Sequence, residues 1–326
     1  MKGNLNSLNM KKLIKATVLV IFLIQLVSCN SKTKTNSKVE VKDVVTQNDS
    51  LVYDTAPRWS PDGTKILFYT YRHDDKGAEL YSLDISSEKM TRLTNTFHNE
   101  WWSDYSKDGK NIFFSSDKDK KKRFGGSEIY VMNVDGTNVR QVTKSRDTTY
   151  NIMPRVSPKG NQLLYSSDAF HYTNSEIYLI NESLEEVNLS NNPAKDQFGS
   201  WSPDGEKVIF QSNRDGNFEI YVMNVDGTNI KRLTNNNYND IDPSWSVNNE
   251  IAFISNRDGD NEIFIMNSDG SNQRQLTFNE VLDVLPSWSP DGSTIAFGTY
   301  RHGKKDKGDI YTIRRNGKGL KRMTPK

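Results

Sequence analysis

Residues 196–234, DQFGSWSPDGEKVIFQSNRDGNFEIYVMNVDGTNIKRLT, contain four short apolar runs separated by three turns. The turns carry Pro-Asp-Gly, Asn-Arg-Asp-Gly and Val-Asp-Gly-Thr. Gly and Asp tolerate the positive φ angles of tight turns, so the stretch predicts four antiparallel strands joined by hairpins. One such sheet cannot bury both of its faces, and it therefore requires copies of itself on either side.

Copies of this unit fill most of the chain. Aligned on the residue before a Ser, the unit recurs at intervals of 43 to 51 residues, at Trp59, Tyr105, Val156, Trp201, Trp245 and Trp288. An acidic residue begins each third run, at Glu79, Glu128, Glu176, Glu219, Glu262 and Asp309. A Thr or Ser ends each fourth run, at Thr94, Thr143, Ser190, Thr234, Thr277 and Thr324. This period predicts an all-β fold, a six-bladed β-propeller of four-stranded blades over residues 53–326.

Composition sets the outer limits on function. The chain has 326 residues and a net charge of +2, and no basic stripe with interleaved aromatic residues occurs, which argues against nucleic-acid binding. The sequence contains no Walker loop, no dinucleotide-binding fingerprint and no Gly-x-Ser-x-Gly elbow. We therefore expect no catalytic residues and no cofactor, and an enzymatic activity is the less favoured alternative.

The N-terminal region has the pattern of a targeting segment. Lys11, Lys12 and Lys15 precede an apolar run over residues 16–27, which is too short to span a bilayer. Cys29, the only cysteine, follows this run in a setting that resembles the lipobox of bacterial lipoproteins. We expect a signal peptide over residues 1–28, and a lipidated Cys29 with a flexible tether over residues 29–52. A buried, unmodified thiol is the alternative.

The repeated strings carry a family resemblance. Trp-Ser-Pro-Asp-Gly at 59–63, 201–205 and 288–292, with Glu-Ile-Tyr-Val-Met-Asn at 128–133 and 219–224, resembles the WD40-like (PD40) repeat of the TolB propeller family. The resemblance covers all six units but not the N-terminal α/β domain that TolB carries. It implies a bacterial cell-envelope protein, here anchored by lipid at the outer membrane and facing the periplasm or the exterior. It does not fix the function, because such blades also occur in peptidases and lyases.

The expected binding face lies at the channel mouth. The connections between second and third strands are longer in four neighbouring units, at residues 71–78, 117–127, 168–175 and 300–308. Insertions on one face of a repeat array favour a binding face, here for a protein or peptide partner. Two loops also carry basic runs, one at 118–123 and one at 304–307, which could attract an acidic glycan.

Six polar residues occupy one position, five residues before each repeat marker. They are Asp54, Glu100, Asn151, Asp196, Asp240 and Asp283. At the entrance to the innermost strand they should circle the channel mouth, where they could bind a cation or a basic peptide. The alternative is a structural role in fixing the turns between blades. We also expect Arg72, Arg214, Arg257 and Arg301 to pair with the acids that begin the third strands.

The histidines support an alternative function. His73, His98, His171 and His302 should all emerge on the same face, where imidazoles could hold a divalent cation. Oligogalacturonate lyases of related propeller type use histidines and a divalent cation, so the resemblance allows a metal-dependent polysaccharide lyase. The bland alternative is four ordinary surface histidines.

Overall fold

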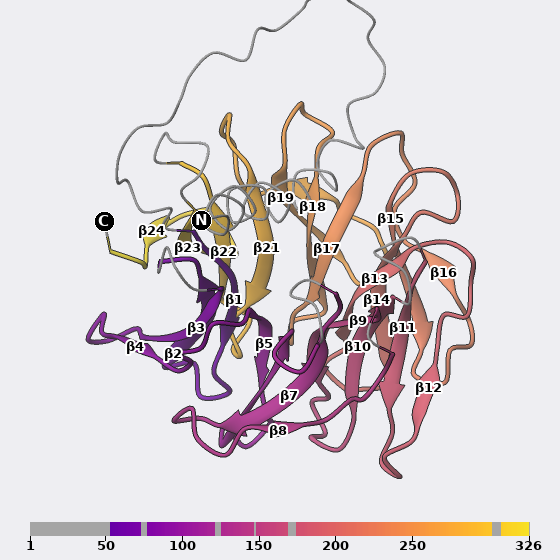
Figure 1. The fold of residues 1–326 in the computed structure, drawn as a ribbon. Helices are drawn as coiled ribbons and strands as arrows, with labels where there is room; N and C mark the ends of the chain where they lie inside the picture. Colours follow the sequence, from indigo (N-terminus) through magenta and orange to yellow (C-terminus); the bar gives the residue numbers. More distant parts are fainter. Residues whose placement is uncertain are drawn as a thin grey trace, which may run out of the picture. The chain divides into compact units, whose positions relative to one another are not determined.

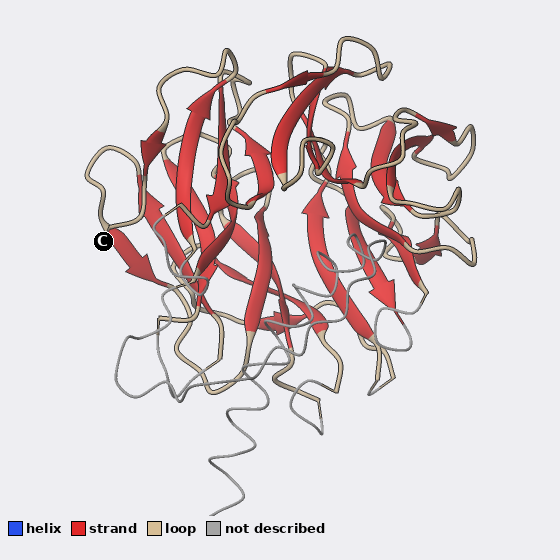
Figure 2. Cartoon of the chain, turned by 90° about the horizontal axis from the view of Figure 1, so that it is seen from above, coloured by secondary structure: helices blue, strands red, loops and turns tan. Residues whose placement is uncertain are grey.

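The described residues form six four-stranded antiparallel sheets. The computed structural model describes residues 53–72, 77–120, 125–146, 148–168, 174–301 and 308–325, all within the compact unit Asp49–Lys326. In each sheet the strands follow one another in chain order, from the innermost to the outermost (Figure 1). Figure 2 shows strands, turns and loops but no helix in this part of the chain, so none of its elements could cross a membrane as a helix. The prediction of six blades is confirmed.

The first three blades have these bounds. Blade 1 contains β1 (Asp54–Trp59), β2 (Lys65–Thr70), β3 (Glu79–Asp84) and β4 (Met90–Arg92). Blade 2 contains β5 (Glu100–Tyr105), β6 (Asn111–Ser116), β7 (Glu128–Asn133) and β8 (Arg140–Gln141). Blade 3 contains β9 (Tyr150–Val156), β10 (Leu163–Asp168), β11 (Ser175–Ile180) and β12 (Glu186–Asn188).

The last three blades repeat the same plan. Blade 4 contains β13 (Asp196–Trp201), β14 (Lys207–Ser212), β15 (Glu219–Asn224) and β16 (Lys231–Arg232). Blade 5 contains β17 (Asp240–Trp245), β18 (Glu250–Ser255), β19 (Glu262–Asn267) and β20 (Arg274–Gln275). Blade 6 contains β21 (Asp283–Trp288), β22 (Thr294–Thr299), β23 (Asp309–Arg314) and β24 (Lys321–Arg322).

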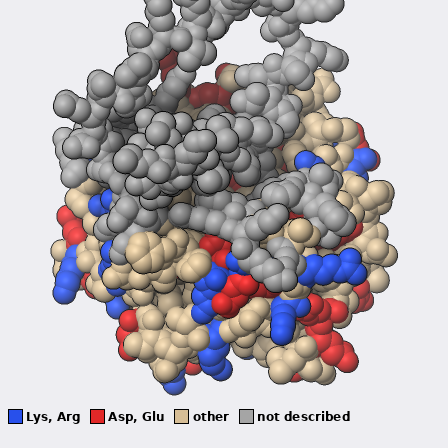
Figure 3. Space-filling view, in the orientation of Figure 1, with Lys and Arg blue, Asp and Glu red and all other residues tan. Residues whose placement is uncertain are grey.

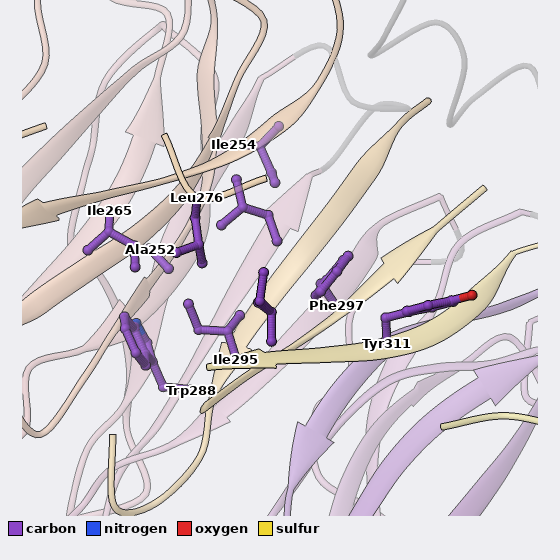
Figure 4. Packing of buried hydrophobic residues seen from close by; sticks show 10 residues of the cluster. Ala252, Ile254, Ile265, Leu276, Trp288, Ile295, Phe297 and Tyr311 are labelled. Atoms are coloured by element: carbon purple, nitrogen blue, oxygen red, sulfur yellow. The ribbon is translucent and has the colours of Figure 1, made fainter. Parts of the chain in front are cut away.

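The hydrophobic core lies between neighbouring blades. One cluster joins Ala252, Ile254 and Ile265 of blade 5 to Trp288, Ile295 and Phe297 of blade 6 (Figure 4). Alternate strand residues point to opposite faces of a sheet, so each blade contributes one apolar face to each neighbour. Closing the ring is therefore what buries both faces of every blade.

Among the described residues, no strand is exchanged between the two ends of the ring. β1 packs beside β21 and β22, indigo beside yellow in Figure 1. The amide of Asp54 donates to Gly308 O at 2.9 Å, and the indole Nε1 of Trp59 donates to Ser287 O at 3.1 Å. The same indole bond recurs at other junctions, from Trp201 to Arg155 O and from Trp288 to Ser244 O. Within the described ranges, each unit supplies the four strands of its own sheet.

The residues that mark each repeat in the sequence form hydrogen bonds with one another and with nearby backbone groups. In blade 1 the Thr94 hydroxyl donates to Glu79 Oε2 at 2.6 Å and accepts the Leu80 amide at 2.9 Å. In the first turn, Ser60 Oγ donates to Asp62 and accepts the Lys65 amide at 2.9 Å. These bonds satisfy buried backbone groups, which explains why an acid begins the third strand and a Thr or Ser ends the fourth.

Every innermost strand carries a β-bulge two residues after its first-strand polar residue. The residues with positive φ there are Ala56, Trp102, Met153, Phe198, Asp242 and Leu285. The pairing register shifts at this point in each first hairpin, for example between Thr55 and Arg58. A bulge re-aims the residues that follow it, so it determines how the innermost strands present side chains to the centre of the ring.

Candidate binding site at the channel mouth

The six first-strand polar residues are buried, with exposed fractions of 3% or less. Four of them form ion pairs with an arginine just beyond the second strand. The pairs are Asp54–Arg72 at 2.5 Å, Asp196–Arg214 at 2.8 Å, Asp240–Arg257 at 3.0 Å and Asp283–Arg301 at 2.7 Å. The expected pairing of these arginines with the third-strand acids is wrong. Since Asp54 lies opposite Thr70 in the first hairpin, Arg72 reaches it directly.

The third-strand acids have other partners, on the fourth strand. Arg92 pairs with Glu79 at 2.8 Å, Arg232 with Glu219 at 2.7 Å and Arg322 with Asp309 at 2.5 Å. Three arginines of the first set, Arg214, Arg257 and Arg301, also pack on aromatic rings. The guanidinium of Arg257 lies 4.6 Å from the centre of the Phe264 ring, and that of Arg214 lies 4.9 Å from the Tyr221 ring. Cation–π contact and ion pairing together fix these three arginines within their blades.

Blade 2 departs from this arrangement because Lys118 replaces the arginine. The Lys118 Nζ lies 4.6 Å from the centre of the Tyr130 ring, as the arginines do in their blades. Glu100 is hydrogen-bonded instead by Thr96 Oγ1 at 2.9 Å. Burial, with the charges of Glu79 and Asp117, raises the pKa of Glu100 to about 7, although the Thr96 bond opposes the shift. Asn151 of blade 3 donates to Glu128 Oε2 at 2.9 Å.

The basic loop after β6 is partly inside the blade. Lys120 Nζ donates to Glu128 Oε1 at 2.7 Å, and its side chain is only 3% exposed. Residues 121–123 and 304–307 lie outside the described part of the chain. Where the charged surface is visible, basic and acidic side chains are interspersed (Figure 3). Lys118 and Lys120 therefore contact groups of their own blade. The expected binding of an acidic glycan depends on the remaining basic residues, which lie outside the described part of the chain.

Only one of the four histidines can be located. His98 Nδ1 lies 3.7 Å from Asp117 Oδ1, and the Asp117 carboxylate also accepts from the Asn99 amide at 2.8 Å. His73, His171 and His302 lie outside the described residues, as does Cys29. Within the described ranges, no group of three His, Cys, Asp or Glu side chains could hold a metal ion.

Aromatic residues that the sequence reasoning missed gather at the same end of the innermost strands. The mouth cluster consists of Tyr53, Tyr69, Tyr71, Trp101, Trp102 and Tyr300. The hydroxyls of Tyr53 and Tyr300 lie 2.5 Å apart, and the rings of Trp101 and Trp102 are stacked with centres 5.8 Å apart. Tyr71 and Tyr300 precede Arg72 and Arg301 in two matching Thr-Tyr-Arg strings. This repetition in the sequence could have identified both tyrosines as members of the cluster.

Three further aromatic side chains are exposed in the connections between blades. Phe97, Tyr238 and Phe278 are 69%, 47% and 75% exposed, and each precedes a first strand by a few residues. Aromatic side chains are enriched among the residues that dominate binding energy at protein interfaces. The exposed aliphatic residues Leu184, Ile230 and Leu320 lie instead around the hairpins between third and fourth strands.

Comparison with known proteins places this architecture in a family. The family model for the TolB β-propeller domain (PD40) matches residues 25–171 and 120–324. An uncharacterized protein of Agrobacterium fabrum is 28% identical over 215 residues, covering 63% of this chain and 68% of that protein. The Tol-Pal system protein TolB of Francisella tularensis subsp. mediasiatica is 25% identical over 195 residues, covering 59% of this chain but only 42% of TolB.

Solved structures show the same fold. TolB of Acinetobacter baumannii superposes with a TM-score of 0.63 at 20% identity, over 82% of this chain and 61% of that one. An oligogalacturonate lyase of Vibrio parahaemolyticus gives 0.58 at 14% identity, over 85% and 80% of the two chains. At these identities the likeness concerns the fold alone. The family-model match extends over nearly all of the propeller, and the chain therefore belongs to the TolB β-propeller family.

Proposed function

We propose that this propeller is a non-catalytic binding module of the bacterial cell envelope, which holds a protein or peptide partner on the face around the channel mouth. The observation that carries the proposal is the set of exposed aromatics Phe97, Tyr238 and Phe278 on the face where the mouth cluster lies. The ion pairs between the first-strand acids and their arginines stabilise the strand ends from which the loops of this face emerge. The relation to the Tol-Pal system protein TolB supports a protein partner in the envelope.

The anchor belongs to the same proposal. Residues 1–28 act as a signal peptide, Cys29 carries lipid, residues 29–52 form the tether and the propeller begins at residue 53. The basic residues before the apolar run and the single cysteine after it support this arrangement. Intact-mass measurement of protein purified from membranes tests it: a chain that begins at Cys29 and carries acyl mass agrees, and a retained leader disagrees.

Photo-crosslinking in living cells tests the binding face. A photoreactive residue in place of Phe278 or Tyr238 should give a discrete crosslinked protein, because both positions lie on the proposed face. The matched control is Leu184, which is 83% exposed but lies in an outer hairpin. Equal crosslinking from Leu184, or none from the two aromatic positions, would contradict the proposal.

The alternative is a metal-dependent polysaccharide lyase that uses His73, His98, His171 and His302. The fold likeness to oligogalacturonate lyase keeps this function in view. Adding Mn²⁺ or Ca²⁺ should then raise the melting temperature, and oligogalacturonate should yield an unsaturated product. Loss of both effects in His73→Ala and His302→Ala would establish the lyase and replace the scaffold proposal.

A further inference from the structure

Two arginines occupy one repeat position on the innermost strands. Arg58 of β1 and Arg155 of β9 each follow the first-strand polar residue by four positions, and Asp104 of β5 holds the equivalent position in blade 2. Blades 4, 5 and 6 carry Ser200, Ser244 and Ser287 there. Asp242, the bulge residue of β17, adds a second carboxyl.

These charged groups converge at the centre of the ring. Arg58 belongs to blade 1, Arg155 to blade 3 and Asp242 to blade 5, and no two of these blades are neighbours. The charges of Arg58 and Arg155 nevertheless influence the pKa of Asp242, and the charge of Arg58 lowers the pKa of Arg155. Charges on alternate blades can act on one another in this way only across the ring axis, because Coulomb interaction falls with distance.

The charges of Asp104 and Asp242 compensate both arginines only in part, since they oppose but do not reverse the lowering of either pKa. Arg155 Nη1 donates to Pro154 O at 2.7 Å, and Arg58 Nη1 donates to Pro57 O at 3.3 Å, both on the arginine's own strand. Across the described ranges, no ion pair joins either guanidinium to a carboxylate. A guanidinium has five N–H donors, so most of this capacity is unused. Arg155 is only 8% exposed.

The arrangement costs free energy in the empty protein. Burial lowers the pKa of both arginines, and the like charge of Arg58 lowers that of Arg155 further. A buried charge that is only partly compensated is destabilising, and a second like charge adds to the cost. Arg58 and Asp104 are only partly buried, so the site has access to solvent. An anion bound between the guanidinium groups would remove the cost.

We propose that Arg58 and Arg155 form an anion site on the ring axis that binds a carboxylate group. Two arginine forks match the planar carboxylate, with which they form paired hydrogen bonds. Asp104 and Asp242 line the same space, so a doubly charged phosphate meets more repulsion than a singly charged carboxylate. Burial raises the pKa of Asp242 to about 7, so its protonated form can also donate to a bound carboxylate.

This site is separate from the face around the channel mouth. The mouth residues lie at the start of the innermost strands, whereas Arg58 and Arg155 lie one residue from the end of theirs. Carboxylate binding by Arg58 and Arg155 does not depend on whether the exposed aromatic residues bind a protein. A carboxylate could come from a peptide C-terminus or from an acidic sugar.

Binding to the full-length protein separates these sources. The probes are triglycine with a free C-terminus, triglycine amide, galacturonate and inorganic phosphate, and the readouts are melting temperature and calorimetric binding. We expect free triglycine or galacturonate to raise the melting temperature, and the one with the larger effect identifies the source. Triglycine amide should have no effect. An equal response to phosphate or to the amide would overturn the carboxylate assignment.

Three variants locate the response. Arg58→Gln and Arg155→Lys should lose it, because each removes one fork. Arg140→Gln should keep it, since Arg140 lies exposed on β8. Arg58→Gln should also melt at a temperature equal to or above that of the unliganded native protein, which a purely structural arginine would not do. An absent response in the native protein, or an unchanged response in Arg58→Gln, would overturn the proposal.

Discussion

The arginines that follow the second strands (the blade arginines Arg72, Arg214, Arg257 and Arg301) differ in their partners from Arg58 and Arg155 on the ring axis (the axial arginines). Arg214 and Arg257 each have a buried carboxylate partner and an aromatic ring beneath the guanidinium. Arg58 and Arg155 instead donate hydrogen bonds only to backbone carbonyls of their own strands, and within the described ranges neither forms an ion pair. The first set completes the fold, whereas the second set retains hydrogen-bonding capacity that a ligand can use. Charge compensation therefore distinguishes structural arginines from candidate binding arginines here.

The largest expected effect comes from removing a blade arginine. Arg257→Met leaves the Asp240 carboxylate buried without its partner, so the free energy of unfolding should fall by about 3 kcal/mol. Arg58→Met, the matched axial change, should leave it unchanged or raise it, because the burial of charge and the repulsion of Arg155 that it removes outweigh the lost attraction of Asp104 and Asp242. Urea unfolding of both variants checks the contrast. Equal losses in the two variants would remove the distinction between the two sets.

Blade 2 offers a pH-dependent version of the same comparison, since Glu100 lacks an arginine partner. Its folded pKa of about 7 exceeds the ordinary unfolded value of about 4.3. Between these values the folded state keeps a proton that the unfolded state has released, so stability falls as pH rises through this window. Glu100→Gln should remove this loss and stabilise the protein by about 2 kcal/mol at pH 8, with little change at pH 4.

Thermal or urea unfolding of Glu100→Gln at the two pH values measures that difference. Lys118→Arg is a second variant, which supplies the arginine that the other blades have at this position. It should reduce the same pH dependence, because a guanidinium close to Glu100 favours the charged carboxylate. Parallel stability curves for Glu100→Gln and the native protein would show that Glu100 titrates normally.

The smallest effect concerns a bond to the backbone of one axial arginine. The Trp201 indole donates to the backbone carbonyl of Arg155 at 2.9 Å, across the junction of blades 3 and 4. Trp201→Phe should cost about 1 kcal/mol for the lost hydrogen bond, beyond any change in packing. Trp288→Phe removes the equivalent bond to Ser244 O, where a serine occupies the position that Arg155 holds in blade 3, and is the control. If the indole bond also positions Arg155, only Trp201→Phe should weaken carboxylate binding.

The sequence was sufficient to predict the blades because every repeat marker has a local bonding role. Thr94 and Glu79, for example, are hydrogen-bonded to each other within one sheet. Strand pairing between neighbours in the chain is fixed by turn chemistry, which a single sequence displays directly. The number of blades, their boundaries and the four strands of each followed from such local rules.

The partners of the arginines could not be predicted in the same way. Arg72 is seven residues from Glu79 and eighteen from Asp54, yet it pairs with Asp54 because the hairpin register brings them together. The convergence of Arg58 and Arg155 depends on ring geometry and on the bulges that re-aim the innermost strands. Long-range closure of this kind leaves no periodic signal in one sequence.

One junction of the ring, between blades 6 and 1, has no polypeptide connecting its two sides directly. It is held by an apolar cluster that joins the two blades and by three polar contacts. These contacts are the backbone bond from Asp54 to Gly308, the indole bond from Trp59 to Ser287 and the exposed ion pair of Lys321 with Glu88. Under mechanical tension between its ends, the propeller should begin to unzip at this seam. Tyr53 and Tyr300 lie on opposite sides of this junction, so a ligand that binds both side chains would hold blades 1 and 6 together.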